Sequence, residues 1–109
     1  MSYPLALLNT TIATTDGDYH IRTISLNEAR VLFANAKSID SAIGHESTAS
    51  VMSTLLGGSV PMNRQDFAQA VGQTALVLKL NGRAPEGKIL SISEIEEMGY
   101  TFKAMIRTA

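Results

Sequence analysis

Cysteine is absent from the 109-residue chain, and histidine occurs only as His20 and His45. The absence of cysteine excludes a disulfide framework, a thiol nucleophile and any cysteine-ligated zinc or iron site. Two histidines also argue against a histidine-rich metal site. We therefore expect neither a metal nor a cofactor.

Long apolar runs are missing too, since runs such as "ALVL" at 75–78 have only the length of a strand. A membrane-spanning helix needs about 20 mainly apolar residues, so we expect no membrane partner. The N-terminal "MSYPLALLNTT" has no basic region followed by a long apolar one, unlike a signal peptide. The expected location is the cytoplasm.

The chain also lacks an excess of positive charge, because nine Lys and Arg residues stand against ten Asp and Glu, a net charge of −1. Proteins that bind long duplexes usually carry a basic surface. Duplex nucleic acid is therefore not an expected partner. A small anionic ligand stays open, because it needs only a few cations at one spot.

The composition, with 45% hydrophobic and 17% charged residues, fits one globular domain over residues 1–109. Two capping boxes, Ser25 with Glu28 and Ser91 with Glu94, mark helix starts. We expect strands at 3–9, 20–24, 74–81 and 100–107, helices at 26–36, from near His45 to the Gly57-Gly58 stop, and between Ser91 and Gly99, and loops at 37–44 and 82–88.

Segment 59–73 has no firm assignment: we expect a turn there, with a short irregular strand or a half-turn as the alternatives. The nearly continuous apolar character of 74–81 predicts a central strand covered on both faces. The pattern as a whole predicts an α/β fold, a mixed sheet of about four to five strands flanked by about three helices.

The stretch "IGHESTASV" at 43–51 places a histidine, His45, in the first turn of the expected second helix. Unpaired N–H groups and the positive end of the macrodipole make such a position suitable for phosphate. Ser47 and Thr48 add hydroxyl donors, Gly44 allows close approach, and His45 could act as a general acid. The stretch alone favours the alternative, an ordinary helix start with a solvated histidine.

The loop "NGRAPEGK" at 81–88 brings Arg83, Glu86 and Lys88 within six residues. A guanidinium could clamp phosphate and a carboxylate could orient an imidazole. In isolation, a solvated polar turn is the favoured alternative.

Arg64, and the group Asn9, Thr10 and Thr11 after the first strand, are further candidates for contact with a phosphate or a base. The alternatives are a surface arginine and Asx or Thr turns that need no ligand. The chain contains no Walker or dinucleotide glycine loop and no Gly-x-Ser-x-Gly elbow.

Three stretches in order, "LLNTTI", "AIGHESTASVMSTLLGGSVPMNR" and "GRAPEGKILSISEI", resemble the small viral and mobile-element ring nucleases that act as anti-CRISPR proteins against type III systems. That family is marked by Ile-Gly-His-Asp-Ser-Thr, an Asn-Arg pair after a Leu-x-Gly turn, and Arg-x-x-Glu-Gly-Lys. The resemblance covers nearly the whole chain. It implies a homodimer in the cytoplasm of an infected host that binds cyclic tetra-adenylate at its dimer interface.

The resemblance also implies a metal-independent reaction, in which a ribose 2′-hydroxyl attacks its own 3′-phosphate and leaves a 2′,3′-cyclic phosphate. By position, His45 would be the general acid, Arg83 would stabilise the transition state, and Glu86 would orient or charge the histidine or the nucleophile. The implied ligand-binding residues are Asn9, Thr11, Gly44, Ser47, Thr48, Arg64 and Lys88.

The chain differs from the family pattern at three positions, with Glu46 in place of aspartate, Pro85 in place of an acidic residue and Gly82 in place of glutamine. Two other functions remain open at this stage. One is a protein that sequesters the cyclic oligoadenylate without turnover, and the other is a small structural or regulatory partner protein.

Overall fold

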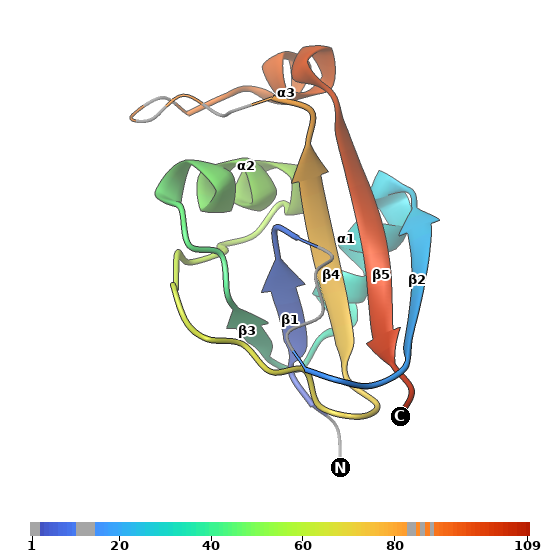
Figure 1. Ribbon diagram of the computed structural model, residues 1–109. Coiled ribbons are helices and arrows are strands. Elements are labelled where there is room, and N and C mark those ends of the chain that lie inside the picture. The colour runs from blue at the N-terminus through green and yellow to red at the C-terminus, as the bar shows by residue number, and fades with distance from the viewer. Residues whose placement is uncertain (1–2, 11–14, 83–84, 86, 88) are drawn as a thin grey trace.

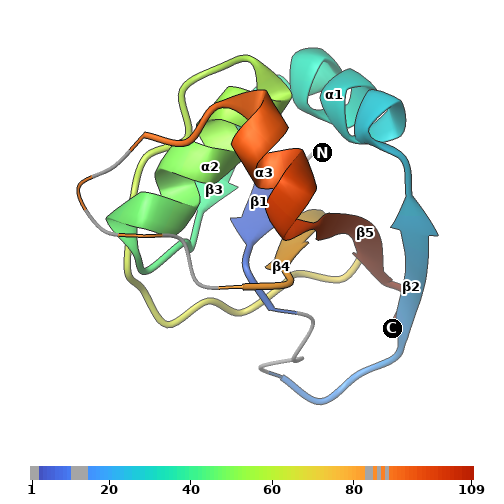
Figure 2. The same cartoon turned by 90° about the horizontal axis from the view of Figure 1, so that it is seen from above.

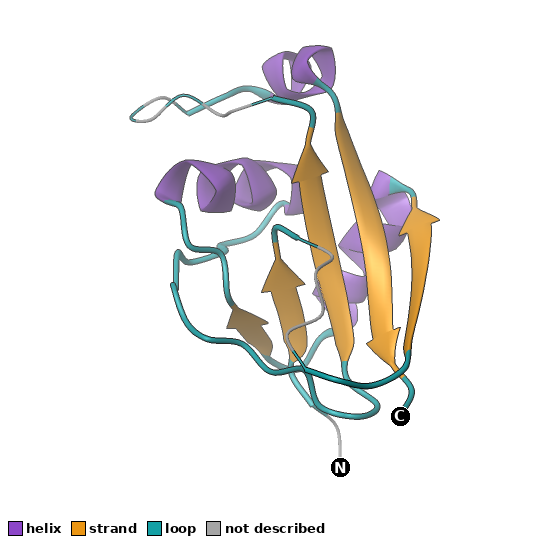
Figure 3. Cartoon of the chain, in the orientation of Figure 1, coloured by secondary structure: helices purple, strands orange, loops and turns teal. Residues whose placement is uncertain are grey.

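The structure is a computed structural model that describes residues 3–10, 15–82, 85, 87 and 89–109. Within these ranges the chain forms five strands and three helices (Figure 1 and Figure 3). In chain order they are β1 (Leu5–Leu8), β2 (Tyr19–Ile24), α1 (Leu26–Asn35), β3 (Ile39–Ser41), α2 (Glu46–Leu56), β4 (Thr74–Leu80), α3 (Ile92–Met98) and β5 (Tyr100–Arg107). None of these helices has the length and apolar character needed to cross a membrane.

The strands form one mixed sheet in the order β2-β5-β4-β1-β3. β1 is parallel to its neighbours β3 and β4, whereas β5 is antiparallel to both β4 and β2. In register, Leu7 of β1 lies opposite Ser41 of β3 and Leu76 of β4. This architecture confirms the predicted mixed sheet with three helices, and it places the carboxyl ends of β1, β3 and β4 at one edge of the sheet.

All three helices pack against the same face of the sheet (Figure 2). Each helix turns an apolar stripe inward, as the helical periodicity of the sequence predicts. Fully buried members of this core are Leu7, Leu76 and Phe102 from the sheet, Ala29 from α1, Met52 and Leu55 from α2 and Ile95 from α3.

The other face of the sheet carries a smaller apolar cluster, made of Ala6, Leu8, Ala75, Val77 and Met105. Its cover among the described residues comes from outside the helices, with Tyr19, Ala42 and Phe67 packed against it. β4 is therefore buried on both faces, which confirms the prediction from its continuous apolar run.

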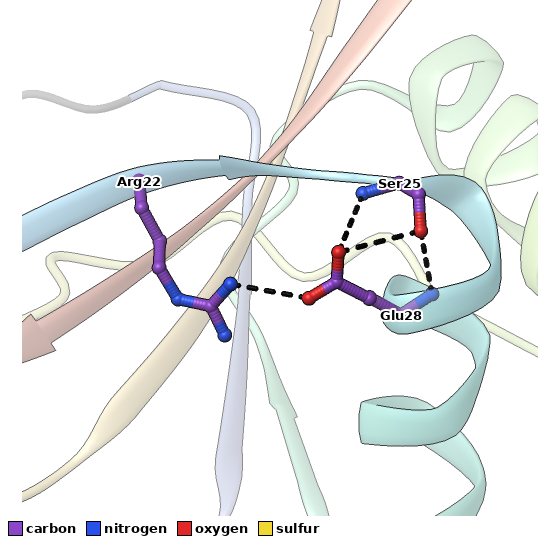
Figure 4. Close-up of polar contacts among 3 residues, drawn as sticks. All are labelled: Arg22, Ser25 and Glu28. Atoms are coloured by element: carbon purple, nitrogen blue, oxygen red, sulfur yellow. Dashed lines mark hydrogen bonds and ion pairs between the residues drawn. The ribbon is translucent and has the colours of Figure 1, made fainter.

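Both predicted capping boxes are present. Ser25 Oγ accepts from the Glu28 N–H at 3.1 Å, and Ser91 Oγ accepts from the Glu94 N–H at 3.2 Å. The Glu28 carboxylate also forms an ion pair with Arg22 at 3.1 Å (Figure 4). The hydrogen bond from Arg22, followed by the one from the Ser25 backbone, lowers the pKa of Glu28 from its ordinary value.

The prediction of a plain loop at 37–44 is wrong, because Ile39–Ser41 forms the edge strand β3. The strand depends on partners distant in the sequence. β1 pairs with it in parallel, and the Leu5 N–H donates to the Ser38 carbonyl at 3.0 Å. Three residues are too few for local periodicity to distinguish a strand from a loop.

Segment 59–73 contains no strand, so the alternative of a further strand there is not realised. Residues 61–65, which we call the β3 strap, instead run beside β3. Ser41 Oγ donates to the Pro61 carbonyl at 2.6 Å, and the Asn63 N–H donates to the Ile43 carbonyl at 2.8 Å. The strap thus satisfies polar groups at and just beyond the edge strand.

The α2 helix ends at the predicted glycine pair. Gly57 adopts the left-handed conformation with φ of 73°, and its N–H donates to the Ser53 carbonyl at 2.9 Å. Gly58 lies against the Phe33 ring, which leaves no room for a side chain at this position. The two glycines are therefore needed for different reasons, the first for its backbone conformation and the second for close approach.

Candidate functional site

The candidate residues follow strands whose carboxyl ends lie at one edge of the sheet. Asn9 follows β1, Gly44 and His45 follow β3, and the 81–90 segment follows β4. These three strands are adjacent and parallel. In open sheets with parallel strands, ligands bind at this edge, so the topology brings together residues that are far apart in the sequence.

His45 is the N-cap residue of α2, with an extended backbone (φ −130°, ψ 131°). The prediction that it lies within the first helical turn is therefore corrected by one position. The histidine side chain makes no capping hydrogen bond, and the first N–H groups of a helix have no partner within it. The start of α2 consequently leaves N–H donors and an exposed imidazole side by side.

A hollow of about 630 Å³ opens at this helix start. Its volume is within the roughly 300–1,000 Å³ range of small-ligand pockets. The residues that line it are Gly44, His45, Glu46, Ser47, Ser50, Met62, Gly87 and Ile89. The hollow thus combines the beginning of α2 with Met62 of the β3 strap and with Gly87 and Ile89, which precede α3 in the chain.

Four of the residues that line this hollow have polar side chains, namely His45, Glu46, Ser47 and Ser50. Among the residues that the structure describes, none of the four side chains has a hydrogen bond or ion pair. An imidazole, a carboxylate and two hydroxyls are therefore available to a bound molecule. They supply both donors and acceptors within two turns of one helix.

Arg64 is brought to the same place by the β3 strap. Its Nη2 donates to the Gly44 carbonyl at 3.4 Å, and a Cβ built on Gly44 would lie 3.3 Å from its Nε. The guanidinium is exposed and adds a positive charge beside the histidine-bearing turn. The structure thus places four predicted residues together, namely Gly44, His45, Ser47 and Arg64.

Two other predicted residues do not line the hollow. Thr48 is half-buried in the first turn of α2, and Asn9 is exposed just after β1. Asn9 is still at the carboxyl edge of the sheet because it follows β1, and Thr48 is near it because α2 begins just after β3. A direct contact of either side chain with a ligand stays a prediction.

Arg83, Glu86, Lys88 and Thr11 lie outside the described residues. Their predicted roles therefore remain predictions. Gly87 and Ile89, which are neighbours of Glu86 and Lys88 in the sequence, are described, and both line the hollow.

Sequence reasoning did not single out Ser50, Met62 or Ile89 as site residues. Ser50 could have been found, because it lies three residues after Ser47 and so shares a helical face with it. Met62 and Ile89 gave no such signal, since their position depends on the strap and on the path of the chain after β4. Glu46 was noticed only as a difference from a family pattern.

The structural comparison shows the same fold in a viral protein. B116 of Sulfolobus turreted icosahedral virus (STIV) superimposes with a TM-score of 0.80 at 24% sequence identity, over 96% of this chain and 100% of that chain. At this identity the likeness establishes the fold.

Sequence comparisons extend the likeness to further proteins. The uncharacterized protein ORF117 of Acidianus two-tailed virus is 35% identical over 104 residues, covering 91% of this chain and 89% of that protein. The uncharacterized protein YddF of Bacillus subtilis (strain 168) is 32% identical over 104 residues, covering 94% and 96%. Residues 5–102 also match the model of one protein family. The chain therefore belongs to the STIV B116-like family, and some of its relatives are viral proteins.

Proposed function

We propose that this protein is a metal-independent ring nuclease that cleaves cyclic tetra-adenylate and so removes the messenger of type III CRISPR immunity. The observation that carries the proposal is the hollow at the start of α2, where His45 and three other polar side chains are free of partners within the described residues. The resemblance of the "IGHESTASV" and "GRAPEGK" stretches to ring nucleases supplies the substrate.

The phosphate of the reacting linkage would bind at the helix N-terminus. Unpaired N–H groups and the helix dipole favour an anion at this position, and the Ser47 hydroxyl lines the same hollow. The exposed Arg64 guanidinium beside Gly44 adds a charge that favours phosphate. This placement brings the scissile bond within the neighbourhood of His45.

In the proposed reaction, the ribose 2′-oxygen attacks the adjacent phosphorus and forms the 2′,3′-cyclic phosphate. The bond from phosphorus to the 5′-oxygen breaks, and His45 donates a proton to that departing oxygen. The attacking 2′-hydroxyl loses its proton to solvent. Glu86 is the candidate that makes this nucleophile more negative, and Arg83 is the candidate that stabilises the transition state. The products carry a 5′-hydroxyl and a cyclic phosphate, so no water is consumed.

We further propose that the protein acts as a homodimer in the cytoplasm of an infected host cell. A ring of four identical nucleotides has two-fold symmetry, and a two-fold dimer presents the same patch twice. One hollow of about 630 Å³ suits a part of so large a ligand. Two copies of His45 would then cleave opposite linkages and give two linear di-adenylates.

The test is incubation of the wild-type protein with labelled cyclic tetra-adenylate in EDTA, with products separated by chromatography. His45→Ala should slow cleavage by about 10²- to 10⁴-fold, the usual contribution of a positioned general acid. His20→Ala is the matched control, because His20 is the other histidine, is exposed and lies in β2, away from the hollow. Its rate should equal that of the wild type.

The outcomes separate the three functions. Tight binding without product, unchanged in His45→Ala, would identify a sequestering protein. If a stoichiometric amount of protein neither binds nor cleaves the ring, the structural or regulatory role is the one that remains.

A further inference from the structure

Two large apolar side chains that line the hollow are exposed to solvent. Met62, in the β3 strap, is 51% exposed, and Ile89, in the segment before α3, is 79% exposed. Single exposed apolar residues are ordinary on a protein surface. Here two of them, from different segments, border the same hollow as the free polar groups of α2, which calls for an explanation.

Each of the two residues adjoins a residue that is held in the fold. On either side of Met62, the Pro61 carbonyl accepts from Ser41 Oγ at 2.6 Å and the Asn63 N–H donates to Ile43 at 2.8 Å. Ile89 precedes Leu90, which is buried in the main core. The hydrogen bonds on both sides of Met62 hold this part of the strap at the hollow, which lowers the ordering cost of a contact between Met62 and a ligand.

The hollow therefore has two chemical halves. His45, Ser47 and Ser50 offer hydrogen bonds, whereas Met62 and Ile89 offer apolar surface. A nucleotide has the same division, because its phosphate and ribose are polar and the faces of its base are apolar. A thioether also makes favourable contacts with aromatic rings.

We infer that Met62 and Ile89 form an apolar clamp for the adenine base of the nucleotide whose phosphate lies at the start of α2. This inference rests on the proposed function, and it adds the residues that select the base. The larger, flat purine covers more of the two side chains than a pyrimidine does. The clamp therefore favours a ring of adenylates over a ring of uridylates.

The test compares cyclic tetra-adenylate with cyclic tetra-uridylate in the wild type and in Met62→Ala/Ile89→Ala. Loss of the apolar contact should weaken binding of the adenylate ring by about ten-fold, with a much smaller effect on the uridylate ring. The rate on the bound adenylate ring should change much less than the affinity, because a contact with the base is made equally in the bound state and in the transition state. Binding is measured by calorimetry and rates by single-turnover assay.

Val31→Ala is the matched control, because Val31 is an exposed apolar residue of α1 that does not line the hollow. It should leave both affinities unchanged. Sedimentation of the double variant should show the oligomeric state of the wild type. A change of oligomeric state together with the loss of affinity would overturn the clamp in favour of a contact between protein chains.

The clamp and the proposed function fail in different ways. If the wild type cleaves cyclic tetra-adenylate but the double variant loses affinity equally for both rings, or for neither, the clamp is wrong and the ring nuclease stands. If the wild type binds neither ring, both are wrong.

Discussion

The Arg64 guanidinium lies against the Gly44 backbone, with its Nη2 donating to the Gly44 carbonyl at 3.4 Å. A methyl group on Gly44 would lie 3.3 Å from Arg64 Nε, so a side chain there would crowd the guanidinium. The contact joins two segments that are separated by α2. It fixes a positive charge beside the residue that precedes His45.

Arg64→Ala should weaken binding of cyclic tetra-adenylate by roughly ten- to a hundred-fold, the range for loss of a hydrogen bond to a charged group. The melting temperature should change little, because Arg64 is exposed and its hydrogen bond to the Gly44 carbonyl is long. Arg22→Ala removes an exposed arginine from β2 and is the control for a change of net charge. Equal affinity loss in both variants, measured by calorimetry, would show that Arg64 has no specific role.

Ser47→Ala should reduce affinity for the ring several-fold, since the hydroxyl lines the hollow without a partner among the described residues. A neutral hydrogen bond contributes about 0.5–1.5 kcal/mol. Thr48→Val removes the neighbouring hydroxyl, which does not line the hollow. It should reduce the affinity less than Ser47→Ala does, because Ser47 and not Thr48 lines the hollow. A larger loss for Thr48→Val than for Ser47→Ala would contradict this assignment.

The Gly57-Gly58 pair allows two destabilising mechanisms to be separated by urea unfolding. Gly58→Ala places Cβ 2.5 Å from a Phe33 ring carbon, and such overpacking costs about 1–3 kcal/mol. A Cβ at position 57 would meet no atom within 4 Å, but alanine would have to adopt the left-handed φ of 73°. This conformation should lower the free energy of unfolding by about 1–2 kcal/mol. Gly57→Asn should recover part of the second loss, because asparagine tolerates this conformation. No difference between Ala and Asn at position 57 would contradict the backbone explanation.

The stability supplied by Glu28 should depend on pH. Its pKa is lowered in the folded chain, first by the hydrogen bond from Arg22 and then by that from Ser25. A carboxyl with a lowered pKa stabilises the fold above its unfolded-state value, and this contribution is lost as the pH falls through the folded value. The difference in unfolding free energy between wild type and Glu28→Gln should therefore shrink on acidification.

Titration of Glu28 followed by NMR should give a midpoint below that of a free glutamate side chain. The midpoint should move toward the ordinary value in Arg22→Ala, which removes the largest cause. Added salt should act in the same direction, because the ion pair is exposed and screened. An unchanged midpoint in Arg22→Ala would assign the shift to Ser25 instead.

The elements that the sequence predicts well are those specified by local chemistry. The capping boxes at Ser25 and Ser91 and the stop at Gly57 depend on residues within a few positions of one another. The buried strand β4 was predicted from its apolar run, which reflects cover on both faces. In each case the pattern and the physical cause lie in the same short stretch of chain.

β3 and the strap were missed because their cause is not local. Ile39–Ser41 becomes a strand only when β1 pairs with it. Asn63 lies beside the chain at the end of β3 through its hydrogen bonds to Ile43 and Ser41. The same reason explains the site. Gly44, His45 and Ser47 were found from one motif, whereas Met62 and Ile89 were not, because their nearness to that motif is a product of the folded chain.

The position of the candidate residues at the carboxyl edge of the sheet has a consequence for how related sequences can differ. Their side chains lie in connections and at a helix start, whereas the packing of the sheet depends on buried apolar residues such as Leu7 and Leu76. Substitutions at the edge can alter chemistry while the core tolerates them without loss of stability. The shared fold at 24% identity agrees with a shape that depends on the core and not on the residues at this edge.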